Sequence, residues 1–289
     1  IISGGEQNLY QKPFFIAYLE PISPLKMDYS GTERLIFCAE RGIPILYAAG
    51  ANCGSGAPIT PEGGVVQGSA ESLAGLVLAT LVNPKVRFVY GANTSAMDMR
   101  STIVSYGDPV WFKTVAMYAD MGKYYGLPSW GTAGSSDSFK VNAQAAMEAY
   151  EGISLVIMSG TSMAHDVGYL AHGELYDPRM LVLTDMMIGR ARFSLKPVDL
   201  SDDALAVDVI NEVAKSEGLY ISHEHTSRFF REALWIPPKY INRRYITDVM
   251  DGSFQELLKR EVNAILEEHE PKRLSEDVEL RVKAYIDSL

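Results

Sequence analysis

The feature that most constrains the fold of this chain is the regular alternation of short apolar segments with longer segments of helical character. Strands and helices that alternate in units of about 25 to 40 residues indicate a parallel sheet joined by right-handed crossovers. The chain is therefore predicted to belong to the α/β class. The segments predicted as strands are 14–20, 44–50, 86–93, 127–134, 153–160 and 218–224.

Two helices carry clear boundary signals. Asp108 suits the N-cap of the first, Pro109 its first turn, and Gly126 the left-handed position just past its end. Asp177 and Pro178 repeat the same start for a second helix. These signals predict helices that return the chain across the sheet.

The ends of the predicted strands favour a (β/α)8 TIM barrel over a doubly wound open sheet. No GxGxxG motif follows the first strand and the sequence contains no P-loop, so a nucleotide-binding sheet has no support. Barrel active sites form from the loops after the strands, where small residues leave a cavity open. Small or polar residues follow predicted strands at 50–52, 91–95, 131–136 and 159–162.

The domain prediction follows from counting strands. Six are predicted and a barrel needs eight, so we expect N-terminal strands to be missing from this sequence. Residues 1–250 are assigned to the barrel. Residues 251–289 are predicted to form a helical tail, broken at Pro271 and capped again at Ser275, that packs on the barrel or on a partner subunit of a homo-oligomer.

Charge and composition exclude several classes of partner. The net charge is −10 and no cluster of basic residues is present, which argues against nucleic acid. The longest apolar runs fall short of the roughly 20 residues that a membrane span needs. Cys38 and Cys53 form neither a CxxC motif nor a disulfide framework, so we expect a soluble protein of the reducing cytoplasm.

Two histidine motifs are candidates for chemistry. His165 and Asp166 follow a predicted strand, where they would serve as an acid/base pair, as a substrate anchor, or simply as a loop cap. His223 and His225 stand two apart, a spacing that on a strand aims both rings to one side and suits a catalytic zinc. This zinc hypothesis lacks ligands, because His165, Asp166, Asp185 and Glu20 are the only further donors that suggest themselves.

Aromatic residues near the predicted strand ends suggest a different ligand. Ring faces hold quaternary or protonated amines through cation–π attraction. Core packing is the alternative for each ring. The residues concerned are Tyr90, Trp130, Phe139 and Tyr169.

Several long blocks of the sequence are distinctive in their residue order. They include PISPLKMDYSGTERLIFCAERGIPILYAAGANCGSGAPITPEGG, GSSDSFKVNAQ, HDVGYL and DDALAVDVI, and they extend from about Pro13 to Tyr245. These blocks resemble the trimethylamine methyltransferase family, whose relatives without pyrrolysine include glycine betaine methyltransferases. The resemblance implies a TIM barrel that moves a methyl group from a methylated amine to the Co(I) of a separate corrinoid protein. It implies no metal or permanently bound cofactor on this chain, because the cobalt arrives on the partner.

Trimethylamine members of the family carry pyrrolysine in the loop that corresponds to GSSDSFKVNAQ. A gapless match places that position at Phe139, and a shift of one residue would place it at Ser138. A phenylalanine ring can stack on a cation but cannot activate a neutral amine. The sequence therefore predicts a quaternary amine such as glycine betaine, and trimethylamine if residue 139 stands where pyrrolysine belongs.

The resemblance also suggests roles for individual residues. Catalytic roles are predicted for Phe139, Asp137, His165 and Asp166. Two alternatives stay open: a metal-dependent barrel hydrolase built on His223 and His225, and a non-catalytic barrel that serves in assembly. The predicted substrate-binding residues are Trp130, Tyr47, Asn93, Ser95, Tyr169, His223 and His225.

Overall fold

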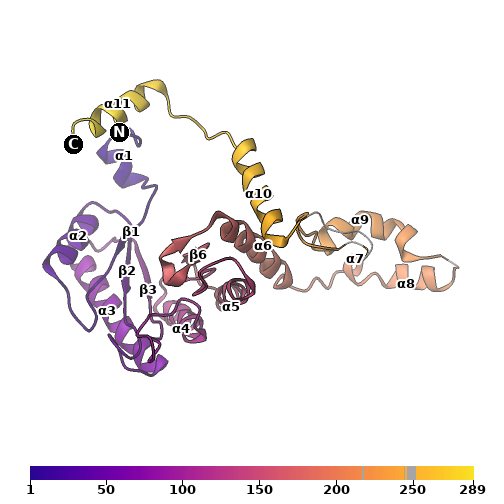
Figure 1. Ribbon diagram of the computed structural model, residues 1–289, viewed down its shortest axis with the longest axis horizontal. Coiled ribbons are helices and arrows are strands. Elements are labelled where there is room, and N and C mark those ends of the chain that lie inside the picture. The colour runs from indigo at the N-terminus through magenta and orange to yellow at the C-terminus, as the bar shows by residue number, and fades with distance from the viewer. Residues whose placement is uncertain (217, 244, 246–251) are drawn as a thin grey trace.

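The computed structural model describes residues 1–216, 218–243, 245 and 252–289. Its central feature is a series of parallel strands that neighbour one another in chain order (Figure 1). The first three form one parallel sheet and the last two a parallel pair, and a parallel bridge between Tyr90 and Ser129 joins the two groups. The strands are β1 Ala17–Leu19, β2 Ile45–Ala49, β3 Phe88–Ala92, β4 Trp130–Thr132 and β5 Met163–His165.

One helix follows each of the first four strands and leads to the next. The crossover helices are α2 Tyr29–Glu40, α3 Pro61–Val82, α4 Pro109–Tyr125 and α5 Ala143–Ser159. A short antiparallel pair and α6 follow β5, and further helices make up the rest of the described chain. These elements are β6 Tyr169–Leu170, η1 Ala171–Gly173, β7 Leu175–Tyr176, α6 Pro178–Ser194, α7 Asp202–Leu205, α8 Val207–Ala214, η2 Tyr220–Ser222, α9 Glu224–Ala233, α10 Phe254–Glu268 and α11 Glu276–Ile286, with α1 Glu6–Gln11 at the start.

The five strands form a strongly curved surface. Across a flat sheet, β1 and β5 would lie about 19 Å apart, four strand spacings of about 4.8 Å. Instead, the ring of Tyr18 on β1 lies 5.6 Å from Trp130 on β4 and 5.8 Å from His165 on β5. These side chains therefore meet on a concave face, which also holds the buried cluster of Leu46, Ala48, Val89 and Trp130.

The predicted α/β class with parallel β-α units is confirmed. The sequential strand order lacks the reversal that defines a doubly wound sheet. The five described strands do not close into a ring, however, and the complete eight-stranded barrel stays a prediction.

The predicted helix starts are also confirmed. The Asp108 carboxylate accepts a hydrogen bond from the backbone N–H of Val110 at 2.7 Å, and Asp177 accepts one from Arg179 at 2.8 Å. Gly126 ends α4 in the left-handed conformation, with φ at 68°. Aspartate oxygens satisfy the unpaired N–H groups of a helix start, so these signals act locally.

Two predicted strands are wrong. Residues 153–160 belong to the second half of α5 and the left-handed Gly160 after it, so residues 159–162 precede a strand rather than follow one. Residues 218–224 contain the turn η2 and the start of α9. A short apolar run does not by itself distinguish a strand from a buried helix, and here the Asn142 cap and Gly160 bound a helix.

Among the described residues, α3 is the one helix long and apolar enough to cross a membrane. It packs against β2 and β3, where a Cβ at Gly75 would collide with the Tyr47 ring. Its Glu71 is buried and accepts hydrogen bonds from Ser23 at 2.6 Å and from the backbone of Leu25 at 2.8 Å. These contacts identify α3 as a core helix of the fold.

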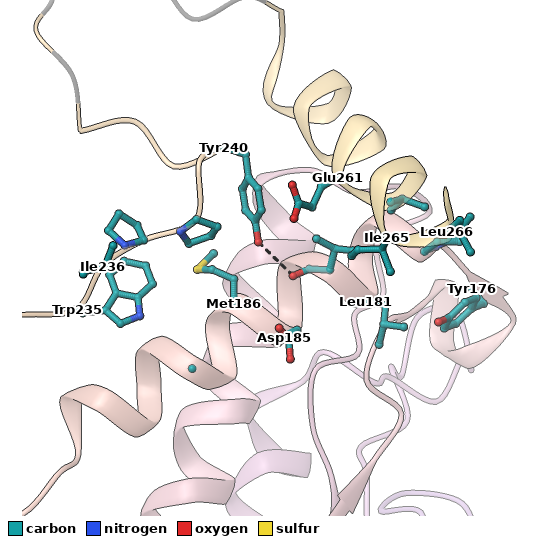
Figure 2. Close-up of a pocket in the computed structure, with 16 residues that line it drawn as sticks. Tyr176, Leu181, Asp185, Met186, Trp235, Ile236, Tyr240, Glu261, Ile265 and Leu266 are labelled. Atoms are coloured by element: carbon teal, nitrogen blue, oxygen red, sulfur yellow. Dashed lines mark hydrogen bonds between the residues drawn. The ribbon is translucent and has the colours of Figure 1, made fainter. Parts of the chain in front are cut away.

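The C-terminal segment contains the predicted helices. Helix α10 packs on α6 through the fully buried Leu258, whereas α11 has no buried residue and Ser275 makes no side-chain capping bond. Between α6, residues 235–240 and α10 lies an apolar groove of about 920 Å³, which Figure 2 shows with Tyr240 bonded to the Val182 carbonyl. The proposed boundary at 250/251 falls outside the described residues.

Candidate functional site

A cavity of about 630 Å³ opens where the parallel strands end. Its walls combine acidic, amide and aromatic side chains from the segments after β1, β2, β3 and β4, together with the η1 turn. Ligands of α/β proteins bind at this edge because the loops after parallel strands converge there. The lining residues are Glu20, Gly50, Asn52, Asn93, Ile103, Val104, Tyr106, Trp111, Phe139, His172 and Glu174.

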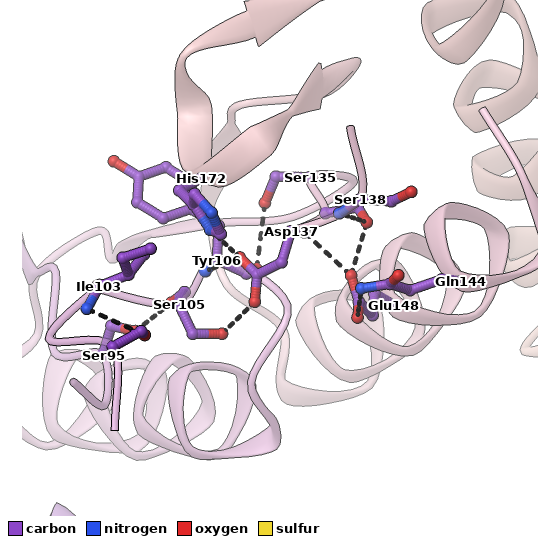
Figure 3. Close-up of polar contacts among 12 residues, drawn as sticks. Ser95, Ile103, Ser105, Tyr106, Ser135, Asp137, Ser138, Gln144, Glu148 and His172 are labelled. Carbon is purple, nitrogen blue, oxygen red and sulfur yellow. Dashed lines mark hydrogen bonds and ion pairs between the residues drawn. The ribbon is translucent and has the colours of Figure 1, made fainter. Parts of the chain in front are cut away.

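Asp137, in the loop after β4, does not line this cavity itself but makes polar contacts with residues beside it, as Figure 3 shows. Its carboxylate accepts hydrogen bonds from the Ser105 hydroxyl and from the backbone N–H of Tyr106, the latter at 2.6 Å. Its Oδ1 also lies 3.0 Å from Nδ1 of His172. Asp137 thus connects the loop after β3, the loop after β4 and the η1 turn.

Glu148 of α5 holds the same loop through hydrogen bonds. Its buried carboxylate accepts hydrogen bonds from the Ser136 hydroxyl at 2.5 Å, the Asp137 N–H at 3.0 Å and the Gln144 amide at 2.9 Å. Hydrogen bonds to charged groups contribute about 1.5–3 kcal/mol each. The small polar residues of this loop therefore hold its backbone in place rather than simply leaving room.

Phe139 and Ser138 have different surroundings. Ser138 is buried, and its hydroxyl bonds to the Lys140 carbonyl at 2.9 Å and the Asn142 amide oxygen at 3.1 Å. Phe139 is 72% exposed, lines the cavity, and lies with its ring centroid 5.9 Å from that of His172. Of the two, only Phe139 presents its side chain to the cavity.

His165 and Asp166 stand at the end of β5, as predicted, although that strand is not the predicted one. Nδ1 of His165 bonds to the Asp166 carboxylate, and its ring lies 4.5 Å from Trp130. Both rings occupy the concave face beside Tyr18. The pair does not line the 630 Å³ cavity itself.

The concave face has a negative electrostatic character. Burial raises the pKa of Tyr18, and the hydrogen bond to Glu20 and the Asp166 carboxylate raise it further. Burial likewise raises the pKa of Tyr106, and Asp166 and Glu20 add to it. Both tyrosines are therefore neutral at physiological pH, and the carboxylates favour a cationic ligand.

A hydrogen-bonded chain crosses the strands at this face. The Asn93 amide donates to the Tyr18 hydroxyl at 3.1 Å, and Tyr18 donates to Glu20 at 2.5 Å. Oδ1 of Asn93 is buried without a partner among the described residues, as is Nε1 of Trp111. An unpaired buried polar atom costs about 1–3 kcal/mol, so these two atoms are candidates for ligand contacts.

Several predicted residues lie away from the cavity. Tyr47 faces the opposite side of the sheet against α3, and Ser95 is buried with its hydroxyl on the Ser105 carbonyl. Tyr169 of β6 packs edge-on against Tyr176 of β7, with ring centroids 5.8 Å apart. These placements remove Tyr47 and Ser95 from the cavity walls.

His223 and His225 do not share a strand face. His223 caps α9 and accepts a hydrogen bond from the backbone N–H of His225 at 3.1 Å. Nε2 of His225 lies 3.0 Å from the Asp203 carbonyl. The strand geometry on which the zinc hypothesis depended is therefore wrong, and the described residues contain no group of three potential metal ligands.

Sequence reasoning missed several cavity residues, among them Tyr106 in the loop after β3. Trp111 stands in the first turn of α4, and His172 and Glu174 follow β6. The positive φ of His172, 59°, is not visible in a sequence. The signal that could have found Trp111 is its position directly after the long loop that follows β3.

Comparison with known proteins assigns the chain to a family. The model of the family described as trimethylamine methyltransferase (MTTB) matches residues 1–288. The chain is 28% identical over 289 residues to a trimethylamine methyltransferase of Desulfitobacterium hafniense, covering 99% of this chain and 58% of that protein. It is 26% identical over 293 residues to a glycine betaine methyltransferase of the same species, covering 99% and 60%.

A trimethylamine methyltransferase of Methanosarcina barkeri is also similar, at 26% identity over 289 residues, covering 98% of this chain and 57% of that protein. The chain thus spans less than two thirds of the length of these relatives. The family match, by contrast, extends over almost all of the present sequence. The chain belongs to the trimethylamine methyltransferase (MTTB) family.

Proposed function

We propose that this protein transfers a methyl group from a methylated amine to the Co(I) of a cognate corrinoid protein, and that its substrate is a quaternary amine. The observation that carries the proposal is the cavity at the strand ends, which combines the rings of Tyr106, Trp111 and Phe139 with the carboxylates of Glu20 and Glu174. Rings and carboxylates together suit a methylated ammonium ion. The family match supports the reaction class.

The reaction requires the nitrogen to leave as a neutral amine. In a quaternary ammonium ion, the carbon–nitrogen bond breaks with its electron pair passing to nitrogen. The corrinoid of the partner supplies the Co(I) nucleophile that accepts the methyl group. The chain's own residues then need only to hold the cation along the line of attack and exclude water around it.

The position of Phe139 supports the quaternary substrate. Its side chain lines the cavity whereas that of Ser138 turns into the loop, which favours residue 139 as the counterpart of the pyrrolysine position. A phenylalanine there offers a ring to a cation but no group that could protonate trimethylamine. Trimethylamine stays the substrate to test if a different residue occupies this position in the natural protein.

The remaining features of the proposal follow from the cavity's place in the fold. The five parallel strands supply part of an eight-stranded barrel over residues 1–250, and the corrinoid protein docks over the strand ends. Residues 251–289 form the tail, whose groove-lining α10 and exposed α11 provide surface for subunit association. The cytoplasm is the proposed compartment, and Cys38 and Cys53 are free thiols, as its reducing conditions require.

The experiment is an anaerobic assay of the natural polypeptide with the Co(I) form of its corrinoid protein. Loss of the Co(I) absorbance is followed with glycine betaine, tetramethylammonium and trimethylamine in turn. We expect methyl transfer from the quaternary amines and none from trimethylamine. Transfer from trimethylamine would overturn the substrate assignment, and corrinoid-protein binding without any transfer would favour an assembly role. A peptide mass spanning residues 131–147 fixes the identity of residue 139.

A further inference from the structure

Two hydrogen-bonding groups in the strand-end cavity have no role in holding a methylated cation. The first is the indole N–H of Trp111, a residue that is 1% exposed and lines the cavity. Its Nε1 has no hydrogen-bond partner among the described residues. Tryptophan N–H groups are donors only, and buried ones are normally paired, so this one calls for an acceptor.

The second group is the imidazole of His172. Its Nδ1 lies 3.0 Å from Oδ1 of Asp137. Figure 3 draws this contact, which leaves Nε2 as the nitrogen available to a ligand. No hydrogen bond joins Nε2 to the rest of the described chain. When the ring is protonated, Nε2 is a second donor at the same cavity.

The backbone that presents His172 is unusual. Ala171 and His172 both have positive φ values, 50° and 59°, and Gly173 follows with 89°. A Cβ at Gly173 would press on the Tyr106 ring. Tyr106 in turn lies edge-on to Trp111, with ring centroids 4.2 Å apart. Strained conformations persist where surrounding contacts enforce them, and they cluster at ligand sites.

We propose that Trp111, together with His172, binds an acceptor group of the substrate and so makes the cavity specific for a quaternary ammonium ion that carries a carboxylate. This inference rests on the proposed function of the same cavity. Two donors match the two oxygens of a carboxylate. The distance of 5.9 Å between the Phe139 and His172 rings allows the ammonium to contact Phe139 while a carboxylate one carbon away reaches His172.

The test compares two substrates that differ in the carboxylate. Glycine betaine carries it and tetramethylammonium does not. Trp111→Phe removes the donor and keeps an aromatic ring in the core, and His172→Asn keeps a residue that tolerates positive φ. Trp235→Phe, in the α6–α10 groove, makes the same chemical change away from the cavity and is the matched control. Each variant is assayed as the natural polypeptide with its Co(I) corrinoid protein.

We expect Trp111→Phe to raise the KM for glycine betaine about 10- to 100-fold. The KM for tetramethylammonium should rise much less, because phenylalanine keeps an aromatic ring against the cation and this substrate has no carboxylate to lose a donor. His172→Asn should act in the same direction, and Trp235→Phe should change neither substrate. Equal losses with both substrates would show a structural role and overturn the inference, as would no loss with either.

A wild-type protein that methylates the corrinoid with neither amine would instead contradict the proposed function. In that case, calorimetry measures the binding of glycine betaine to the wild type and to Trp111→Phe. The comparison tests the role of Trp111 independently of methyl transfer. Weaker binding by the variant supports it. Equal binding, or no binding by either protein, overturns it.

Discussion

Replacing Glu148 with alanine should destabilise the loop that carries Phe139. Glu148 is 9% exposed, and its carboxylate accepts hydrogen bonds from the hydroxyl of the fully buried Ser136 and from the backbone N–H of Asp137. Alanine leaves these two donors without an acceptor. The third donor, the Gln144 amide, lies on an exposed residue and regains a water partner.

The expected loss of stability follows from the two hydrogen-bond donors that are left without an acceptor. Each costs about 1–3 kcal/mol when buried unpaired, and relief of the buried charge offsets part of the sum. The expected loss in the free energy of unfolding is therefore about 3 kcal/mol. For a chain of this size, about 2 °C of melting temperature corresponds to each kcal/mol, which predicts a decrease of about 6 °C.

Two assays separate the loop from the rest of the fold. Thermal denaturation gives the overall change, and limited trypsin digestion reports cleavage after the exposed Lys140, within the same loop. Cleavage at that site should be roughly tenfold faster in Glu148→Ala. Glu151→Ala, an exposed carboxylate one turn further along α5, is the matched control and should stay within about 0.5 kcal/mol of the wild type. If Glu148→Ala melts and is cleaved like Glu151→Ala, the loop is held by other contacts and the reasoning is refuted.

Three further predictions concern other parts of the molecule. His165→Ala should reduce methyl transfer roughly tenfold or more while the melting temperature stays within about 2 °C, because the ring is partly exposed beside Trp130; unchanged kinetics would remove His165 from the site. The hydrogen bonds from Arg179 lower the pKa of Asp177 in the folded protein. The ionised Asp177 therefore stabilises the fold fully above about pH 4, and this contribution is lost as the pH falls through the folded pKa. Asp177→Asn, which keeps a capping acceptor, should therefore melt about 1–3 °C lower at pH 7 and converge with the wild type once the pH lies below the folded pKa of Asp177. A difference that stays constant as the pH falls through the acid range would contradict the ion pair. Burial raises the pKa of the Cys38 and Cys53 thiols, so Ellman's reagent should label neither within minutes in native buffer and both in guanidinium, and rapid native labelling would show that these sites open.

The sequence predicted best those features that local chemistry determines. The N-cap aspartates and Gly126 act within one turn of a helix, so their roles could be derived without tertiary structure. The missed strand β5 is three residues long and partly exposed, whereas the apolar run before it completes α5. Neither the length nor the apolar content of these two segments could show that the first is helix and the second is strand.

The site was predicted in part for a related reason. The argument from position after a strand named Phe139 and Asn93, and both line the cavity. The same argument named Tyr47, which packs on the other face of the sheet, because successive strand residues face opposite sides and only the sheet's packing shows which side is concave. Trp111 and His172 reach the cavity from a helix and a turn, and their convergence depends on contacts between segments distant in the sequence.

The loop after β4 has a thermodynamic consequence for binding. Phe139 is largely exposed, yet the residues before it are fixed by Glu148 and by the Ser138 hydrogen bonds. The conformational entropy of this backbone is thus lost during folding and not when a ligand arrives. A cation that binds to the ring therefore has to lose its hydration shell, whereas the loop loses little conformational entropy. The affinity of the cation should depend mainly on its hydration free energy. Weakly hydrated methylated ions are thus favoured over smaller ammonium ions of the same charge.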